Sequence, residues 1–417
     1  MKKACFLGGI MALMVILFVG CGKEEEEKLK ICVNAAGQAG IDCLVSTWQE
    51  MEGGSEVEFI IIPTDKNEAE MKISELRTEL MAGEGPDIFL LECEQPAQEE
   101  VRDGLFVDLE KTMETGLFLP LDEYIENAKH MDTSWWNQTV LDAGKTEEGQ
   151  VVLPLYYCLP AYVFESSDLS GQEVPNSWEE LMASENPVLK NAVKGQTFSY
   201  FTYSFGDLAD YQAGTLTFSE EELKSYVEEF LAFEIAVNEQ EDMQNLPEPI
   251  VGGWISEDFF YGGMGKAVED QQTYVSIPNR EGSVTAMVTM FAALNKNTTK
   301  AEEAFALLDF LLSDEVTSGR GFEGYGGTFD LHPDTSVNIT VNQKAFQERY
   351  CKNDKAKTAF ETLNDRIECV RFYSALDRDL YNLRDDVRIM SYKSEDTSYI
   401  GDLVKTTYET MQMRLAE

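Results

Sequence analysis

Residues 57–91 read VEFIIIPTDKNEAEMKISELRTELMAGEGPDIFLL, two apolar runs separated by a stretch of mixed charged and apolar residues. The first run, Val57–Ile62, is rich in β-branched residues and is followed by proline, which is typical of a strand. In the middle stretch, apolar residues recur every three or four positions, which predicts an amphipathic helix. They are Ala69, Ile73, Leu76 and Leu80. A Gly-Pro turn then leads into a second predicted strand, 87–91.

The same pattern extends toward the N-terminus. Leu29–Asn34 reads as a strand, and residues 41–51 have helical character. The resulting order of strand, helix, strand, helix, strand predicts a parallel sheet covered by helices on both faces. Two later apolar segments, 151–164 and 284–294, are expected to carry the chain between two lobes, because prolines exclude a helix from the first.

The amino-acid composition excludes several classes of function. The chain has 417 residues, with 76 Asp and Glu against 33 Lys and Arg, for a formal net charge of −43. Its length predicts two domains or lobes. The acidity argues against nucleic acid, whose phosphates need a basic face, and against docking on anionic lipid headgroups. With only His130 and His332, a His-rich metal site is excluded, and neither a resident metal nor a cofactor is expected.

Cysteine spacing predicts no redox motif and no zinc knuckle, because no pair has C-x-x-C spacing. Cys32, Cys93 and Cys158 lie in apolar stretches and are interpreted as small core residues. Cys351 and Cys369 could pair, and their spacing does not decide it.

The N-terminus has the layout of a secretory signal peptide. Two lysines precede an apolar run over residues 6–19, which is shorter than the roughly 20 residues that span a bilayer. The sequence LFVGC, ending at Cys21, resembles a bacterial lipobox. That resemblance implies cleavage before Cys21 and a diacylglyceryl group on its thiol. Residues 1–20 would then be the signal peptide, and residues 21–28 an acidic tether on the outer face of the cell membrane.

Several segments resemble one protein family, in the family's own order. They are 75–90 (ELRTELMAGEGPDIFL), 104–109 (GLFVDL), 149–154 (GQVVLP) and 295–314, which begins NKNTTKAEEAF. Together with the lipobox, they resemble the extracellular solute-binding lipoproteins of sugar-type ABC importers, a family that is similar to maltose-binding protein.

The resemblance implies an α/β fold of the two-lobe, periplasmic-binding-protein-like type II, with mostly parallel sheets flanked by helices and with hinge strands between the lobes. The N-terminal lobe would comprise residues 29–153 plus about 286–340. The C-terminal lobe would comprise residues 154–285 plus about 341–417. A ligand would be enclosed between the two.

Enzyme motifs are absent or lack their context. Residues 319–324 fit G-x-G-x-x-G but follow a helix rather than a strand. Gly265-Lys266 lacks the earlier glycine and the hydroxyl residue of a phosphate-binding loop. A glycosidase uses a pair of carboxylates, but with 76 acids in the chain some pair will lie at a suitable distance by chance, so such a pair does not indicate a glycosidase. We therefore expect no catalytic residue and no enzyme activity.

Candidate ligand contacts follow from the chemistry of sugars. Aromatic platforms and planar hydrogen-bonding groups bind them, and in α/β lobes such groups lie on loops after the carboxyl ends of strands. The candidates are Gln38, Asp65, Glu92, Glu94, Tyr156, Tyr157, Tyr200, Trp254 and Tyr325.

Two pairs among them have predicted orientations. Glu92 and Glu94 share a face if extended, whereas Tyr156 and Tyr157 point to opposite faces, so one ring would face the cleft and the other the core. By contrast, Trp135, Trp136 and Trp178 lie in predicted helices and are interpreted as core residues.

The sequence thus predicts a monomeric, lipid-anchored binding protein. It would capture a small molecule, expected to be a sugar or an oligosaccharide, and deliver it to the permease subunits of an ABC importer. Two alternatives stay open at this point. One is a surface glycoside hydrolase. The other is a binding protein for a peptide, a polyamine, a metal or another non-sugar solute.

Overall fold

The computed structural model describes residues 28–93, 104–169, 174–189, 201–238, 251–254, 272–322, 331, 338–351, 353–392 and 397–416. Strand β1 (Leu29–Asn34) lies between β2 (Val57–Ile62) and β3 (Ile88–Glu92) and is parallel to both. Helices α2 (Gln38–Glu52) and α3 (Lys66–Met81) make the two connections. The predicted strand–helix order and parallel pairing are confirmed.

Local sequence explains these elements. Ala69, Ile73 and Leu76 are buried on one face of α3, as the three- and four-residue spacing predicts. The chain then turns into β3 through Gly83 and Gly85, whose φ angles of 80° and 113° favour glycine.

The first sheet continues across a long central strand, β12 (Val284–Leu294), in which every residue is buried. β12 is antiparallel to β3 and to β6 (Leu153–Cys158) and parallel to β14 (Ile367–Phe372). The short strand β13 (Ile339–Thr340) pairs with the outer side of β6. The strand order is β13-β6-β12-β3-β1-β2, with β14 added beside β12.

A second, smaller sheet has β7 (Pro160–Glu165) between β10 (Val251–Trp254) and β11 (Gln272–Ser276). Both pairings are antiparallel, whereas the sequence predicted mostly parallel sheets. The reason is geometric. β7 continues β6 after a single residue, and β11 leads into β12, which is already antiparallel to β6, so the two chain segments stay antiparallel as they cross.

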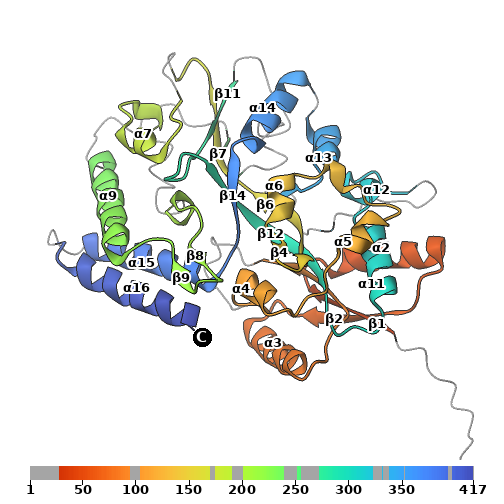
Figure 1. Cartoon of the computed structure of the whole chain (residues 1–417). Helices are drawn as coiled ribbons and strands as arrows, with labels where there is room; N and C mark the ends of the chain where they lie inside the picture. Colours follow the sequence, from red (N-terminus) through yellow and green to blue (C-terminus); the bar gives the residue numbers. More distant parts are fainter. Residues whose placement is uncertain are drawn as a thin grey trace, which may run out of the picture.

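Helices cover both sheets (Figure 1). Beside the first lie α4 (Leu109–Glu114), α5 (Asp122–Glu126), α6 (Gln138–Asp142), α11 (Ala301–Leu311), α12 (Asp314–Thr317), α13 (Gln343–Tyr350) and α14 (Asp354–Asn364). Around the second lie α7 (Trp178–Ala183), α9 (Glu220–Asn238), α15 (Ala375–Ser391) and α16 (Tyr399–Ala416). The 3₁₀ turns are η2 (Thr133–Trp135) and η3 (Thr202–Ser204). The hairpins are β4 (Lys145–Thr146) with β5 (Gly149–Gln150), and β8 (Ala209–Asp210) with β9 (Thr215–Leu216).

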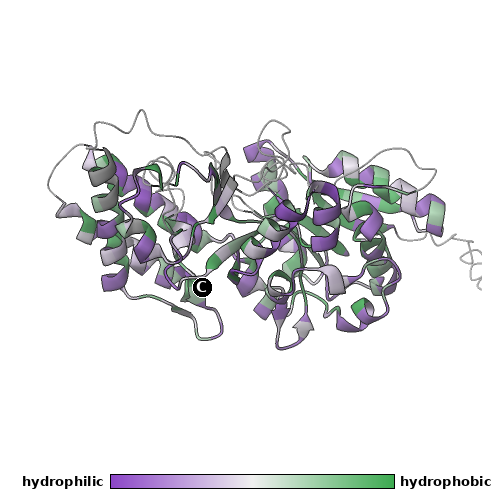
Figure 2. Cartoon of the chain, turned by 90° about the horizontal axis from the view of Figure 1, so that it is seen from above, coloured by the Kyte–Doolittle hydropathy of each residue, from purple (hydrophilic) through white to green (hydrophobic). Residues whose placement is uncertain are grey.

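The buried apolar residues form two separate clusters, which we call the first and the second core. Figure 2 shows the corresponding two bodies side by side along the long axis of the molecule. The first core contains the large sheet, and the second contains α9, α15 and α16. The two-lobe α/β fold expected from the sequence is therefore confirmed.

Three short passages join the lobes. β6 continues into β7, β11 returns into β12, and β14 leads into α15. The third passage falls between Phe372, in the first core, and Tyr373, in the second. The apolar residues of α13 and α14 belong to the first core. Among the described helices, none combines the length and apolar character needed to cross a bilayer.

Candidate functional site

The two lobes meet at the carboxyl end of β3. Leu91, Glu92 and Cys93 line one side of a small cavity there, together with residues 104–107, Leu109 and Phe291. Tyr373, Ser374 and Arg378, at the start of α15, line the other side. The cavity is about 30 Å³, which holds a water molecule or two and excludes a sugar ring. It marks the inner end of the interlobe junction rather than a preformed sugar pocket.

Hydrogen bonds fix the end of β3 at this junction. The backbone N–H of Glu92 donates to Asn34 Oδ1 at 2.8 Å, which ties the ends of β1 and β3 together. The next N–H, of Cys93, donates to the carbonyl oxygen of Thr289 at 2.7 Å. The Glu92 side chain is thus held, half-buried, where the lobes meet.

The structure gives Asp65 a role that the sequence analysis missed. Its carboxylate Oδ1 accepts hydrogen bonds from the backbone N–H groups of Asn67 and Glu68, both at 3.0 Å, and so caps α3. The sequence could have indicated this role, because aspartate just before a predicted helix is a preferred N-cap residue. Gln38, another candidate, is the first residue of α2 and is half-buried.

Tyr156 and Tyr157 both belong to the first core and are 5% and 0% exposed. The Tyr157 hydroxyl donates to Asn364 Oδ1. Burial raises the pKa of the Tyr157 hydroxyl above its usual value, so the phenol stays neutral. Neither ring is open to solvent in this structure, so an open cleft face for one ring stays a prediction.

The other candidates cannot be placed in full. Glu94, Tyr200 and Tyr325 lie outside the described residues, as does Cys21. Trp254 ends β10 opposite Pro160, and its side chain is not described.

A buried ion pair at the third passage was not predicted from the sequence. Arg371, at 2% exposure on β14, donates through Nη1 to Asp377 Oδ1 at 2.9 Å and through Nη2 to the Thr202 carbonyl oxygen at 2.7 Å. Asp377 also accepts from the N–H and the hydroxyl of Ser374, and the two form a capping box at the start of α15. In the sequence, Ser374 is followed three residues later by an acid, which is the spacing of a capping box, so this helix start could have been predicted.

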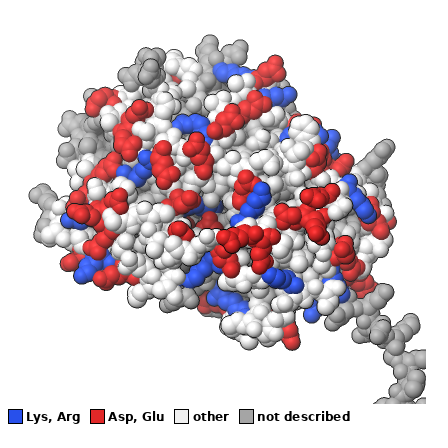
Figure 3. Space-filling model, in the orientation of Figure 1, with Lys and Arg blue, Asp and Glu red and all other residues white. Residues whose placement is uncertain are grey.

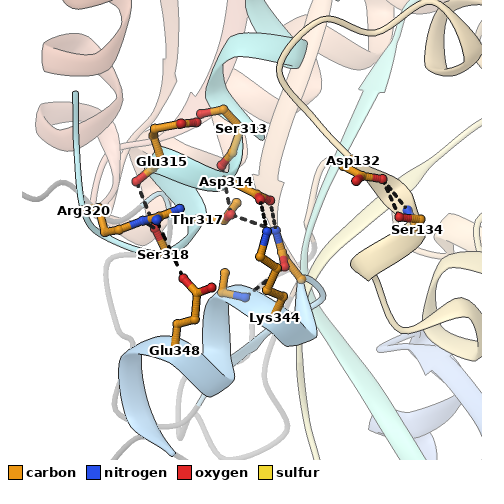
Figure 4. Close-up of polar contacts among 12 residues, drawn as sticks. Asp132, Ser134, Ser313, Asp314, Glu315, Thr317, Ser318, Arg320, Lys344 and Glu348 are labelled. Carbon is orange, nitrogen blue, oxygen red and sulfur yellow. Dashed lines mark hydrogen bonds and ion pairs between the residues drawn. The ribbon is translucent and has the colours of Figure 1, made fainter. Parts of the chain in front are cut away.

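Other charged side chains lie on the surface or link neighbouring helices. Figure 3 shows acidic side chains spread over the visible face, with basic ones between them. A polar network joins α12 to α13, where Asp314 accepts from Asn342 Nδ2 at 2.8 Å and from Lys344 Nζ at 3.0 Å (Figure 4). Lys344 Nζ lies 4.9 Å from the ring centroid of Trp135.

Trp135 itself is 48% exposed, so its interpretation as a core residue was wrong. Trp136 and Trp178 are buried as expected. Cys32 and Cys158 are buried as expected, Cys93 is half-buried against the first core, and no disulfide links Cys351 to Cys369.

A cavity of about 450 Å³ lies between α2, α5 and α11, lined by Trp48, Tyr124 and Phe305 among others. Trp48 and Glu52 lie near the far end of α2, which places this cavity roughly 15–20 Å from the carboxyl ends of the strands. It belongs to the base of the first lobe and not to the interlobe junction. Within the described parts of the chain, no group of three or more His, Cys, Asp or Glu residues could hold a metal ion.

Two α/β lobes joined by three short passages are typical of hinged proteins that close around a ligand. A sequence profile of the bacterial extracellular solute-binding protein family matches residues 34–318, more than half of the chain. The chain belongs to this family.

Solved structures share the fold. A family 1 extracellular solute-binding protein from Alicyclobacillus acidocaldarius is 15% identical, with a TM-score of 0.56 over 94% of this chain and 99% of that one. A periplasmic oligogalacturonide binding protein from Yersinia enterocolitica is 11% identical, with a TM-score of 0.56 over 93% and 99%. A cyclic alpha-maltosyl-1,6-maltose binding protein from Arthrobacter globiformis is 12% identical, with a TM-score of 0.53 over 93% and 100%. None of the curated proteins compared matches the chain.

Proposed function

We propose that this protein captures a sugar or an oligosaccharide between its two lobes and delivers it to the permease of an ABC importer. The observation that carries the proposal is the two-core architecture with three passages, in a chain that belongs to the solute-binding family. Three structures with the same fold are described as binding an oligogalacturonide, a cyclic maltosyl-maltose and α-D-tagatose, which supports a carbohydrate as the ligand class.

The two cores support a division into lobes. The first lobe would comprise about residues 29–158 and 284–372, and the second about 159–283 and 373–416, with the side chains of β7 divided between the two cores. This division moves residues 341–372 into the first lobe, because their apolar side chains pack in the first core.

The ligand would lie between the lobes, over the junction that Glu92 lines. Glu92 is the candidate contact with the strongest support, because residues of both lobes surround it. Gln38, Glu94, Tyr200, Trp254 and Tyr325 remain candidate contacts on the sequence argument. Asp65 is the weakest, because its carboxylate is engaged in capping α3.

The N-terminus supports attachment to the membrane. β1 begins at Leu29, shortly after Cys21, so only a short acidic stretch would separate the first lobe from lipid on that cysteine. The two acyl chains of a diacylglyceryl group would anchor the protein stably, where one chain would not. On this proposal, the protein works as a monomer on the outer face of the membrane and binds its ligand without changing it.

A calorimetric and thermal-shift screen tests the function. The chain without residues 1–20 is mixed with mono- and oligosaccharides, and we expect at least one of them to raise the melting temperature with concentration. Glu92→Gln should weaken binding of that sugar by about tenfold, the loss of one charge-assisted hydrogen bond. Glu58→Gln, on the exposed side of β2, is the matched control.

Two results would contradict the proposal. One is a flat response to every sugar by a folded protein. The other is recovery of a cleaved sugar after incubation, which would favour the glycoside hydrolase instead.

A further inference from the structure

The cavity of about 450 Å³ between α2, α5 and α11, which we call the α5 cavity, lies away from the interlobe junction. Three helices and the loop that follows α5 supply its lining. Its volume falls within the range of sites for small molecules. The α5 cavity therefore has room for a guest of several non-hydrogen atoms.

Aromatic side chains form the inner wall of the α5 cavity. Trp48 and Phe305 are almost fully buried, whereas Tyr124 is half-buried. The ring centroids of Tyr124 and Phe305 lie 5.2 Å apart, with the two planes tilted by 36°. Such rings offer a guest both an apolar surface and a negative π face, and the π face attracts cations.

Carboxylates lie around the rim of the α5 cavity. Glu52, Glu123 and Glu302 belong to its lining and are exposed to solvent. Burial, followed by the charges of Glu302 and Glu123, raises the pKa of the Tyr124 hydroxyl above its usual value. The charges of these two carboxylates therefore act on the same space as the aromatic wall.

The other ionisable groups of the lining do not cancel this charge. The Asp309 carboxylate accepts three backbone N–H bonds from the loop after α5. His130 Nε2 lies 3.7 Å from Glu52 Oε1, and its ring is charged only when protonated. Of the described residues that line the cavity, Lys129 alone is a lysine or an arginine, and it is exposed. The lining therefore carries a net negative charge at neutral pH.

The rim carboxylates do not make a metal site, because no group of three His, Cys, Asp or Glu residues in the described parts of the chain could hold a metal ion. A molecular cation has no such requirement. An ammonium group brings three N–H donors of its own, and these can reach carboxylates that do not converge on one point. An apolar aromatic wall below an acidic rim thus fits an ion with a hydrocarbon part and an ammonium head.

We propose that the α5 cavity binds a primary alkylammonium ion, with the ammonium group between Glu123 and Glu302 and the alkyl chain against Tyr124 and Phe305. The proposal goes beyond the capture of a sugar and does not rest on it, because the α5 cavity is separate from the interlobe junction. A bound ion would join α5 to α11 and so stabilise the first lobe.

The charge and the alkyl chain of the ion can be tested separately. n-Butylammonium chloride is titrated into the sugar-free protein at constant ionic strength. Ammonium chloride keeps only the charge of this probe, and 1-butanol keeps only its chain. Calorimetry measures the affinity, and the NMR signal of the Ala306 methyl group reports on the cavity that it lines. We expect butylammonium to shift that signal to saturation and to bind at least about fivefold more tightly than either other probe.

Variants around the rim locate the ion. Glu302→Gln should weaken binding about threefold, whereas Glu303→Gln, in the same first turn of α11 but outside the lining, should leave it nearly unchanged. Tyr124→Leu should weaken binding about two- to fivefold, because the cation loses a π face. Lys129→Gln should strengthen binding, because it removes the competing positive charge from the rim.

A blocking variant gives an independent check. Ala306 is exposed in the lining, so Ala306→Phe can place a ring in the α5 cavity without entering the first core. We expect this variant to bind butylammonium at least about tenfold more weakly. Melting temperatures and far-UV spectra show whether each variant is folded.

Three results would overturn the proposal. One is an Ala306 methyl signal that butylammonium shifts no more than ammonium chloride does. Another is equal affinity in Glu302→Gln and Glu303→Gln. The third is unchanged binding in a folded Ala306→Phe variant. None of these results bears on whether the protein binds carbohydrate, and a failed sugar screen would leave the test of the α5 cavity unaffected.

Discussion

Arg371 Nη1 lies 2.9 Å from Asp377 Oδ1, and both side chains are almost fully buried, at 3% and 1% exposure. Arg371 is the last residue but one of β14 in the first lobe, while Asp377 lies in the first turn of α15 in the second. The pair therefore fixes the direction in which the chain leaves the third passage. Ser374 lies between them and donates to the same carboxylate from its N–H and its hydroxyl.

Removal of the carboxylate should strongly destabilise the protein. Asp377→Ala leaves the Arg371 guanidinium buried without its counter-charge, and we expect a loss of about 3–5 kcal/mol in the free energy of unfolding. Asp386→Ala, an exposed position on the same helix, should change it by less than about 0.5 kcal/mol. Urea unfolding measures both. A loss below about 1 kcal/mol for Asp377→Ala would show that the pair contributes little.

Asp65 distinguishes a capping role from a ligand role. Asparagine caps helices as well as aspartate does, so Asp65→Asn should leave the stability nearly unchanged, whereas Asp65→Ala should cost about 1 kcal/mol. Neither substitution should change sugar affinity if the carboxylate only caps α3. Thermal unfolding and calorimetric titration check the two expectations. A large loss of affinity in Asp65→Asn would restore Asp65 to the ligand site.

Tyr157 should matter through its hydroxyl. Tyr157→Phe keeps the ring in the first core but leaves Asn364 Oδ1 with one donor fewer, since Asn137 Nδ2 still contacts it at 3.1 Å. We expect a loss of about 0.5–1.5 kcal/mol in unfolding free energy. Tyr124→Phe, a half-buried tyrosine of the same lobe, is the control. An unchanged stability in Tyr157→Phe would mean that the hydroxyl bond contributes nothing measurable.

The first part of the fold could be predicted from local patterns alone. β1, α2, β2, α3 and β3 are short, strongly periodic and adjacent both in sequence and in space, so one rule about parallel crossovers orders them. The two apolar crossing segments were also recognisable, because each is a long apolar run and two prolines excluded a helix from the first.

The third passage could not be predicted in the same way. Periodicity predicts helices α13 and α14, because each has an apolar face. It does not predict which of the two cores that face joins. Their assignment depends on contacts between distant residues, such as the hydrogen bond from Tyr157 to Asn364. The antiparallel pairing of the second sheet depends likewise on strands β7, β10 and β11, which are far apart in sequence.

The same limit applies to the interlobe junction. Glu92 was found by a rule about strand ends, which is local. Arg371 and Asp377 form a buried pair that also reaches the distant Thr202 carbonyl, and in sequence each is an ordinary charged residue among many. Among 76 acids, nothing local distinguishes those that face an interface from those that face water.

Asp309 should be among the most important acids for the first lobe. Its carboxylate is buried and accepts backbone N–H bonds from three consecutive residues, Lys129, His130 and Met131, at 2.7, 3.0 and 2.8 Å. It therefore holds the loop after α5 against α11. Asp309→Ala leaves three donors without this acceptor, and we expect a loss of about 2–4 kcal/mol in unfolding free energy.

Two comparisons separate this effect from charge alone. Asp309→Asn keeps one carbonyl acceptor and should recover part of the loss, while Glu303→Gln removes a charge from the same helix away from the loop and should be nearly neutral. Hydrogen exchange at the three amides should rise in Asp309→Ala before the rest of the lobe is affected. Unchanged exchange at these amides would contradict the anchoring role of Asp309.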